Sequence, residues 1–167
     1  IKDTDNVTLY DYNLALDLYY YTSTWKEQKK ILKKSDLELF MRDRGSKIDL
    51  LNIQWIYRAK KYYNMKPADI YLMLIPIHYK LSTELVKDMV EAPGVEEFEN
   101  VVIRTTYARH YNFKQNLTME QMYADCLHHL YTADRRKNPY SVSAINTYLF
   151  LKEEELKKLT TVMECVR

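Results

Sequence analysis

Glycine and proline are scarce in this sequence, with 2 Gly and 4 Pro among 167 residues. A β-sandwich or β-barrel needs turn residues about every 8–12 positions, so both all-β classes are excluded. A phosphate- or dinucleotide-binding loop needs several glycines, because the backbone must approach the ligand closely. The two isolated glycines, Gly45 and Gly94, cannot supply such a loop. We therefore expect the protein to bind no nucleotide tightly and to use no cofactor.

Cysteines and long apolar runs are also few. Cys126 and Cys165 are the only cysteines, and the absence of a disulfide framework is typical of a reducing compartment. No segment approaches the ~20 uncharged apolar residues that a membrane-spanning helix needs. The first residue is Ile1 and no signal peptide is visible, so we expect a piece of a longer chain.

The residues that are abundant indicate a helical protein. Hydrophobic residues make up 47% of the chain and charged residues 29%, a composition typical of a globular protein. Leu, Lys, Glu, Ala and Met, all good helix formers, are common. The sequence therefore predicts an all-α fold. A chain of this length buries about 70% of its unfolded surface, enough for one domain or for two small helical units sharing an interface.

Apolar spacing and capping residues locate the expected helices. They are predicted over residues 8–34, 35–63, 67–75, 82–92, 95–111, 118–137 and 141–167. Asp5 or Asn6 is the expected cap of the first helix, and Ser35, with Glu38 three residues later, that of the second. We expect residues 19–24 (YYYTST) to bend or break the first helix. Pro67, Ser82 and Thr118 are the expected start signals of later helices.

Two of these helices carry distinctive apolar patterns. Residues 48–63 are apolar on nearly every side, which indicates a central, buried helix. In the last helix, apolar residues recur in steps of three and four: Val142, Ile145, Leu149, Leu156, Leu159, Met163 and Val166. The missing member of this series falls at Lys152, whose ammonium must be paired or reach water.

One segment concentrates side chains that could carry chemistry, namely Asp125, Cys126, His128 and His129. Cys126 and His129 lie on one helix face, but zinc needs further ligands at defined spacing and no second cluster is present. The glutamates at 153–155 spread around a helix axis and are typical of a solvated face. The sequence therefore predicts no catalytic residue, no metal site and no enzymatic activity.

Charge is unevenly distributed although the net charge is only +2. Residues 26–34 contain five lysines and one glutamate, whereas residues 84–99 contain six acidic residues and one lysine. Such blocks are either solvated helix faces or electrostatic docking surfaces. Because of the lysine block, nucleic-acid binding stays open as an alternative. However, no sequence motif of a known nucleic-acid-binding domain accompanies the block. We expect no nucleic-acid partner.

Three motifs, in this order and spacing, resemble one family. Residues 15–20 (ALDLYY) resemble its "aLD-x-x-Y/F" element, residues 47–60 (KIDLLNIQWIYRAK) its "iDl-x-Ni…RaK" element, and residues 148–159 (YLFLKEEELKKL) its "Y-x-x-x-KexE-x-x-x-L" element. The matched polar positions are Asp17, Asp49, Asn52, Arg58, Lys60, Lys152, Glu153 and Glu155. The chain is thus similar to the C subunit, named d in eukaryotes, of the V-type or A/V-type rotary ATPases and ATP synthases.

The resemblance implies a non-catalytic part of the rotor. Members are built from related helical units arranged as a funnel on the cytoplasmic face of the membrane c-ring, peripheral to the membrane. The D and F subunits of the central stalk seat in the funnel, so that the family member passes torque from the shaft to the ring. Residues 1–66 would be the family's middle unit and residues 67–167 a later one. A generic helical interaction scaffold or a nucleic-acid-binding helical module is the alternative function.

The chain departs from the family at residues 74–78 (LIPIH), where relatives often carry a glycine-rich loop after the proline. Two roles stay open for the matched polar residues: pairing inside the helical bundle, which buried polar groups require, or direct contact with a partner.

The chain is also expected to repeat internally. A shift of 92 positions places Ile53 on Ile145 and Lys60 on Lys152. We expect residues 35–63 and 138–167 each to be the inner helix of a small bundle, because such repeats are completed by their neighbours. Each lysine should then lie near a carboxylate or a helix C-terminus.

Overall fold

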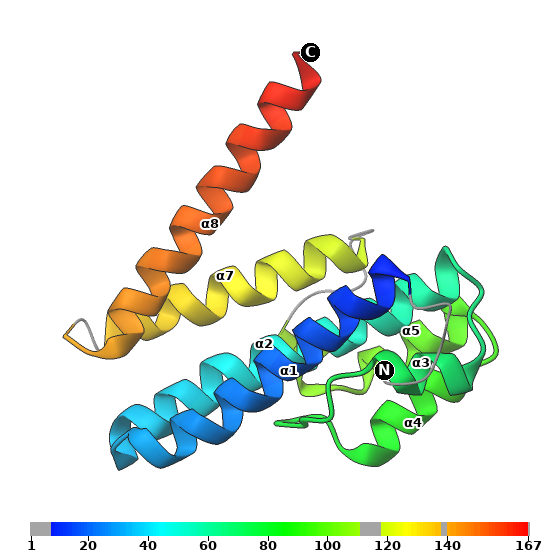
Figure 1. The fold of residues 1–167 in the computed structure, drawn as a ribbon, viewed down its shortest axis with the longest axis horizontal. Coiled ribbons are helices and arrows are strands. Elements are labelled where there is room, and N and C mark those ends of the chain that lie inside the picture. Colours follow the sequence, from blue (N-terminus) through cyan, green and yellow to red (C-terminus); the bar gives the residue numbers. More distant parts are fainter. Residues whose placement is uncertain (1–7, 111–117, 138–139, 167) are drawn as a thin grey trace.

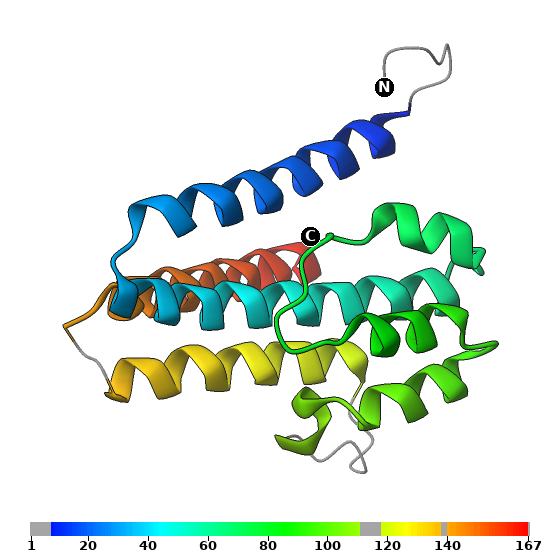
Figure 2. The same ribbon diagram turned by 90° about the horizontal axis from the view of Figure 1, so that it is seen from below.

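The computed structural model describes residues 8–110, 118–137 and 140–166, and every regular element in these ranges is an α-helix. The helices are α1 (Leu9–Ile31), α2 (Lys34–Lys61), α3 (Pro67–Met73), α4 (Thr83–Glu91), α5 (Val95–Ile103), α6 (Thr106–His110), α7 (Met119–Lys137) and α8 (Val142–Cys165). The predicted all-α fold is confirmed. Figures 1 and 2 show α2 running through the middle of the molecule, with α7 beside it and α3–α6 gathered around its C-terminal half.

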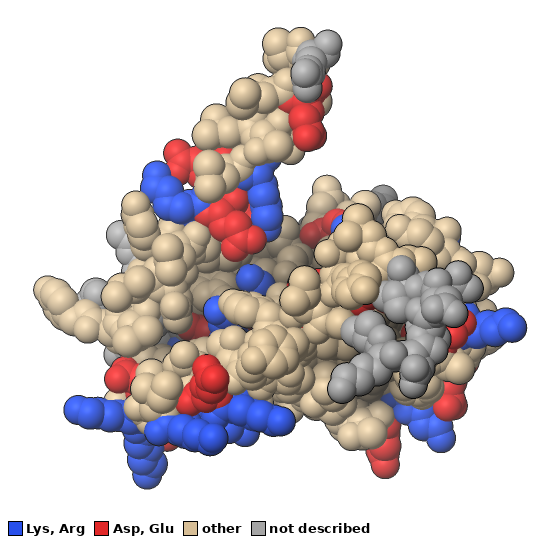
Figure 3. Space-filling view, viewed as in Figure 1, with Lys and Arg blue, Asp and Glu red and all other residues tan. Residues whose placement is uncertain are grey.

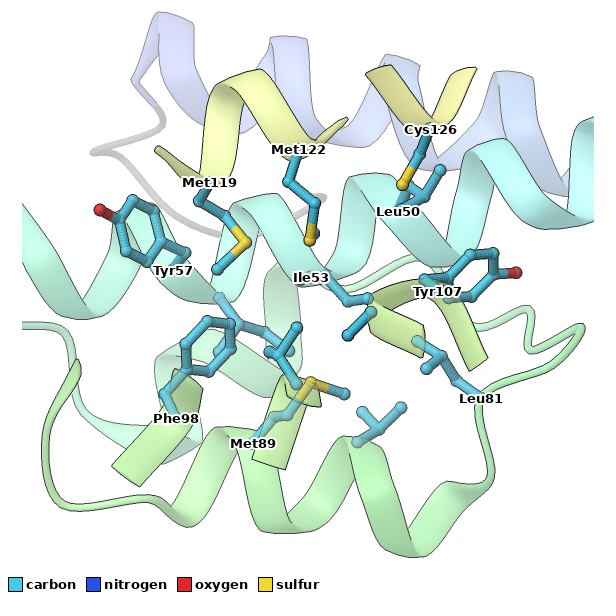
Figure 4. Close-up of a cluster of buried hydrophobic side chains, with 14 of the residues drawn as sticks. Leu50, Ile53, Tyr57, Leu81, Met89, Phe98, Tyr107, Met119, Met122 and Cys126 are labelled. Atoms are coloured by element: carbon cyan, nitrogen blue, oxygen red, sulfur yellow. The ribbon is translucent and has the colours of Figure 1, made fainter. Parts of the chain in front are cut away.

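Most of the buried apolar side chains in the described ranges form one large hydrophobic core around α2. Figure 4 shows side chains from α2, α4, α5 and α7 meeting there, and Ile53, Met89 and Phe98 are completely buried. Ile48 and Ile56 of α2 are also at most 1% exposed. The prediction that residues 48–63 form a central helix is confirmed for α2, and the reason is that apolar side chains on all its faces find neighbours.

Several helices begin where local signals predict. Pro67 is the first residue of α3. The backbone N–H of Leu85 donates to the Ser82 hydroxyl at the start of α4, at 3.2 Å, and the N–H of Gln121 donates likewise to Thr118 before α7, at 3.2 Å. These side chains satisfy backbone donors that have no partner within the first helical turn.

The first helix differs from expectation at its start and middle. Thr8 caps α1 through a capping box with Asp11, whereas the expected caps, Asp5 and Asn6, lie outside the described residues. The helix is continuous through residues 19–24, so the expected break is wrong. The Thr22 hydroxyl donates to the Leu18 carbonyl at 2.6 Å, which satisfies its polar group without opening the helix.

Ser35 does not cap the second helix. The N–H of Leu37 donates to the Lys33 carbonyl at 2.7 Å, so α2 begins at Lys34 and Ser35 lies within its first turn. The single helix expected over residues 95–111 is divided into α5 and α6. Thr105 separates them, because its hydroxyl donates to the Val102 carbonyl at 2.7 Å and accepts from the Ala108 N–H at 3.3 Å.

The last helix packs by a face other than its strongest apolar stripe. Thr147 and Phe150 are buried, and Phe150 stacks on Tyr131 of α7 with ring centroids 4.6 Å apart. Every member of the stripe is exposed, from Val142 to Val166. Figure 1 shows the C-terminal half of α8 projecting from the body. The expectation that this helix is the inner member of a bundle is wrong.

The first helix is held by a second, smaller cluster. None of the residues of α1 is buried. Leu18, Tyr21 and Trp25 pack instead against Ile48 of α2 and against Ile75 and Ile77, which follow α3. No helix within the described ranges is long and apolar enough to cross a membrane.

Candidate interaction site

Asp49, in the middle of α2, anchors the segment that connects α3 to α4. Its carboxylate accepts backbone N–H bonds from Tyr79 at 3.0 Å, Lys80 at 2.7 Å and Leu81 at 3.2 Å. It also accepts from the Tyr107 hydroxyl of α6 at 2.7 Å. One fully buried carboxylate therefore ties three backbone amides and a second helix to α2.

The surroundings of Asp49 alter two pKa values. Burial raises the pKa of the Asp49 carboxyl, although the backbone and phenol hydrogen bonds to it act in the opposite direction. Burial, together with the neighbouring Asp49 carboxylate, raises the pKa of the Tyr107 phenol. The tyrosine therefore remains a hydrogen-bond donor at physiological pH.

Asn52, one helical turn after Asp49, holds the beginning of the same segment. Its side-chain amide donates to the Ile75 carbonyl and accepts from the Ile75 N–H, both at 3.0 Å. Residues 74–81 form what we call the anchored loop. Its side chains Ile75 and Ile77 are buried, so it contributes packing as well as a defined backbone path.

The anchored loop approaches α2 closely at Gly45. A Cβ atom on this glycine would lie 2.6 Å from the Cβ and Cγ atoms of Tyr79, closer than non-bonded carbon atoms can pack. Only glycine therefore leaves room for the Tyr79 ring. An isolated glycine inside a helix is a sequence signal of such close approach.

The remaining matched residues of α2 face other elements. The Lys60 ammonium donates to the carbonyls of Val90, at 2.7 Å, and Ala92, at 2.6 Å, at the C-terminus of α4, and burial lowers the pKa of this amine. Arg58 is half exposed and lies 3.6 Å from Glu120 of α7. The expectation that Lys60 lies near a helix C-terminus is confirmed.

The matched residues of the other two motifs lie at the surface. Asp17 is exposed on α1. On α8, Lys152 lies 2.6 Å from Glu155, and Glu153 lies 3.0 Å from Lys157. The hydrogen bond from Lys157 lowers the pKa of Glu153, as do the charges of Lys47 and Arg44 on α2. Lys152 is near a carboxylate, as expected.

The two lysines of the expected repeat nevertheless have dissimilar surroundings. Lys60 is partly buried between α2 and α4, whereas the side chain of Lys152 is 52% exposed on the projecting helix. The structure does not support the expected equivalence of residues 35–63 and 138–167. It brings Asp49, Asn52 and Lys60 to one side of α2, and it leaves Asp17 and the α8 residues apart from them.

A groove of about 510 Å³ lies between α1 and the anchored loop. One helix face of α1 forms the first wall with Thr22, Trp25, Lys26 and Lys29, and residues 76–79 form the second. The sequence did not indicate Trp25, Pro76, Ile77 or Tyr79 as site residues. Only the departure of residues 74–78 from the family's pattern pointed to this segment.

The side chains that suggested chemistry in the sequence do not converge. Cys126 is buried in the core and His128 and His129 are exposed. Across the described ranges, no group of three His, Cys, Asp or Glu side chains is placed to hold a metal ion.

The described ranges thus form an all-helical body in which buried polar residues of α2 anchor a loop. The model of the ATP synthase (C/AC39) subunit family matches residues 1–167, and the chain belongs to that family. The resemblance to the C subunit of V-type ATPases is thereby confirmed. No curated protein and no solved structure matches the chain.

Proposed function

We propose that the chain is a non-catalytic central-stalk component of a V-type ion-translocating ATPase or ATP synthase, coupling the rotor shaft to the membrane c-ring. The observation that carries this proposal is the family match over residues 1–167. In this role the chain lies peripherally on the cytoplasmic face of the membrane. Its partners are the D and F subunits of the stalk and the c-ring.

The packing of the molecule supports a mechanical role. Torque passes through a protein only if that protein deforms little, and close-packed helices have low compressibility. The 28-residue helix α2 is continuous and packs against α4, α5, α7 and α8. The anchored loop adds hydrogen bonds across the body instead of a flexible glycine-rich connection.

The matched polar residues divide into two roles in this proposal. Asp49, Asn52 and Lys60 maintain the shape of the body, because their polar atoms are bound to other parts of the chain. Asp17, Lys152, Glu153 and Glu155 are exposed and available to partner proteins. The division into units 1–66 and 67–167 stays a prediction, and elements from both ranges share the main core.

Binding to a purified D–F stalk complex tests the proposal directly. We expect the immobilised chain to bind D–F, and the alternative of a generic helical scaffold or nucleic-acid module predicts no binding. If the lysine-rich or acidic block is a docking face, the association rate falls as salt rises above ~0.15 M, where screening extends over only ~8 Å. Absence of D–F binding, with and without the c-ring, would contradict the proposal.

A calorimetric titration with ATP tests the non-catalytic character. We expect no stoichiometric binding and no hydrolysis, because the chain lacks a glycine-rich phosphate loop. A saturable heat of binding at one nucleotide per chain would contradict this expectation.

A further inference from the structure

We propose that the groove between α1 and the anchored loop binds an acidic, extended segment of a partner protein. This inference goes beyond the proposed function, since it concerns the chemistry of the bound segment and not the assembly that supplies it. It rests on the charge, the shape and the rigidity of the groove.

The charge of the groove is of one sign. Lys26 and Lys29 belong to the α1 wall, and no acidic residue is among the lining residues. Within the described part of the chain, neither lysine forms an ion pair; the Lys29 ammonium lies over the Trp25 ring, 5.1 Å from its centroid. The groove is continuous with the lysine-rich end of α1, and Figure 3 shows Lys and Arg gathered where α1 ends and α2 begins.

The rest of the groove is largely apolar and aromatic. Trp25 belongs to the α1 wall, Pro76, Ile77 and Tyr79 belong to the loop wall, and Met41 of α2 completes the lining. Aromatic side chains commonly provide the energetically dominant contacts of protein interfaces. A segment that combines acidic with apolar side chains therefore matches both features of the groove.

The loop wall is already organised for binding. Asp49 and Asn52 hold its backbone by five hydrogen bonds. The contact between Tyr79 and Gly45 sets the position of the aromatic ring. Binding a partner segment would therefore cost little entropy for ordering this wall, which favours association.

An acidic protein segment fits the groove better than a nucleic acid. Nucleic-acid binding needs an extended basic surface, whereas the net charge of the chain is +2 and an acidic block occupies residues 84–99. The groove offers two lysines beside apolar surface, which suits a segment that combines acidic and apolar side chains.

The test uses a short fluorescein-labelled peptide of glutamate and leucine residues, with a matched peptide that carries lysine in place of glutamate. We expect the intact chain to bind the acidic peptide and not the basic one. Reversing both charges, with Lys26→Glu and Lys29→Glu together, should weaken binding about tenfold, because each attractive pair becomes a repulsion. The matched control is Lys66→Glu with Lys87→Glu, two exposed lysines outside the groove, which should change the affinity less than about twofold.

A second readout keeps the result independent of folding. Thermal unfolding should be nearly unchanged in both double variants, since all four lysines are exposed. The inference is overturned if the acidic peptide does not bind, if it binds the Lys26/Lys29 variant as tightly as the original chain, or if an oligonucleotide binds these lysines while the peptide does not. Failure of D–F binding alone leaves this result unaffected.

Discussion

Asn52 determines the path of the anchored loop through a single side chain. Both polar atoms of its amide bond to the backbone of Ile75, which is fully buried. A buried backbone donor or acceptor without a partner costs roughly 1–3 kcal/mol. Asn52 therefore supplies partners for a buried donor and a buried acceptor that would otherwise be unpaired.

The substitution Asn52→Ala should lower the free energy of unfolding by about 2–4 kcal/mol, since it leaves the Ile75 N–H and carbonyl unpaired. Urea unfolding followed by circular dichroism measures the change. Asn100→Ala, at an exposed position of α5, is the matched control and should alter stability by less than about 0.5 kcal/mol. Equal effects of the two substitutions would show that the Asn52 bonds do not support the fold.

Lys60 and Lys152 provide a second comparison at the level of single residues. Lys60→Met removes two charge-assisted hydrogen bonds at the end of α4 and should cost about 1–2 kcal/mol. Lys152→Met removes only an exposed ion pair with Glu155 and should cost less than about 0.5 kcal/mol. The same urea experiment measures both values. Similar losses in the free energy of unfolding would contradict the different surroundings that the structure gives the two lysines.

At the scale of elements, α8 carries two stripes with the same spacing. The apolar stripe passes through Val142, Ile145 and Leu149, and a second stripe passes through Ala144, Thr147 and Leu151. The two are offset by two residues, a rotation of about 200° around the helix. The second stripe faces α7 and the first faces away. Apolar spacing alone therefore indicated a helix but selected the wrong face.

The two faces of α8 should differ in their tolerance to substitution. Phe150→Ala should destabilise the protein by about 3–5 kcal/mol, because it removes a buried ring stacked on Tyr131. Leu156→Gln should change stability by less than about 0.5 kcal/mol, since this side chain is 64% exposed. Thermal or urea unfolding of both variants checks the pair. A large loss at Leu156 would mean that the stripe is buried in the folded chain.

At the scale of the whole molecule, the helices are unequally attached. The main core joins α2 with later helices, whereas α1 contacts the body through the smaller cluster that includes the anchored loop. Trp25 also lies near Phe40 of α2, with ring centroids 6.2 Å apart. Stability within a protein follows such differences in buried contacts.

Amide hydrogen exchange should follow this order of attachment. We expect fast exchange in α1, which has no buried residue, and in the exposed C-terminal half of α8. Exchange should be slowest in residues 48–60 of α2, because most of these residues are deeply buried. Mass spectrometry of exchanged peptides measures the order. If the amides of α1 exchanged as slowly as those of α2, the result would contradict the weaker attachment of α1 to the body.

The sequence by itself determined the all-α class, the central position of α2 and the starts at Pro67, Ser82 and Thr118. These features depend on composition, on the apolar character of one segment and on hydrogen bonds that reach only a few residues along the chain. The motif residues Asp49, Asn52 and Lys60 were selected because they match the family's sequence pattern, and that pattern did not indicate their partners.

Only the tertiary structure decided which residues those partners are and which face of α8 is buried. Asp49 meets Tyr79 and Tyr107, which lie 30 and 58 positions further along the chain. Such contacts depend on how whole helices pack, and no local spacing encodes them. Packing of the helices likewise brought Tyr79 close to Gly45 and placed Trp25 opposite the anchored loop. The groove exists because α1 and the anchored loop, which are distant in sequence, pack against the same part of α2 and leave basic side chains of α1 at its edge.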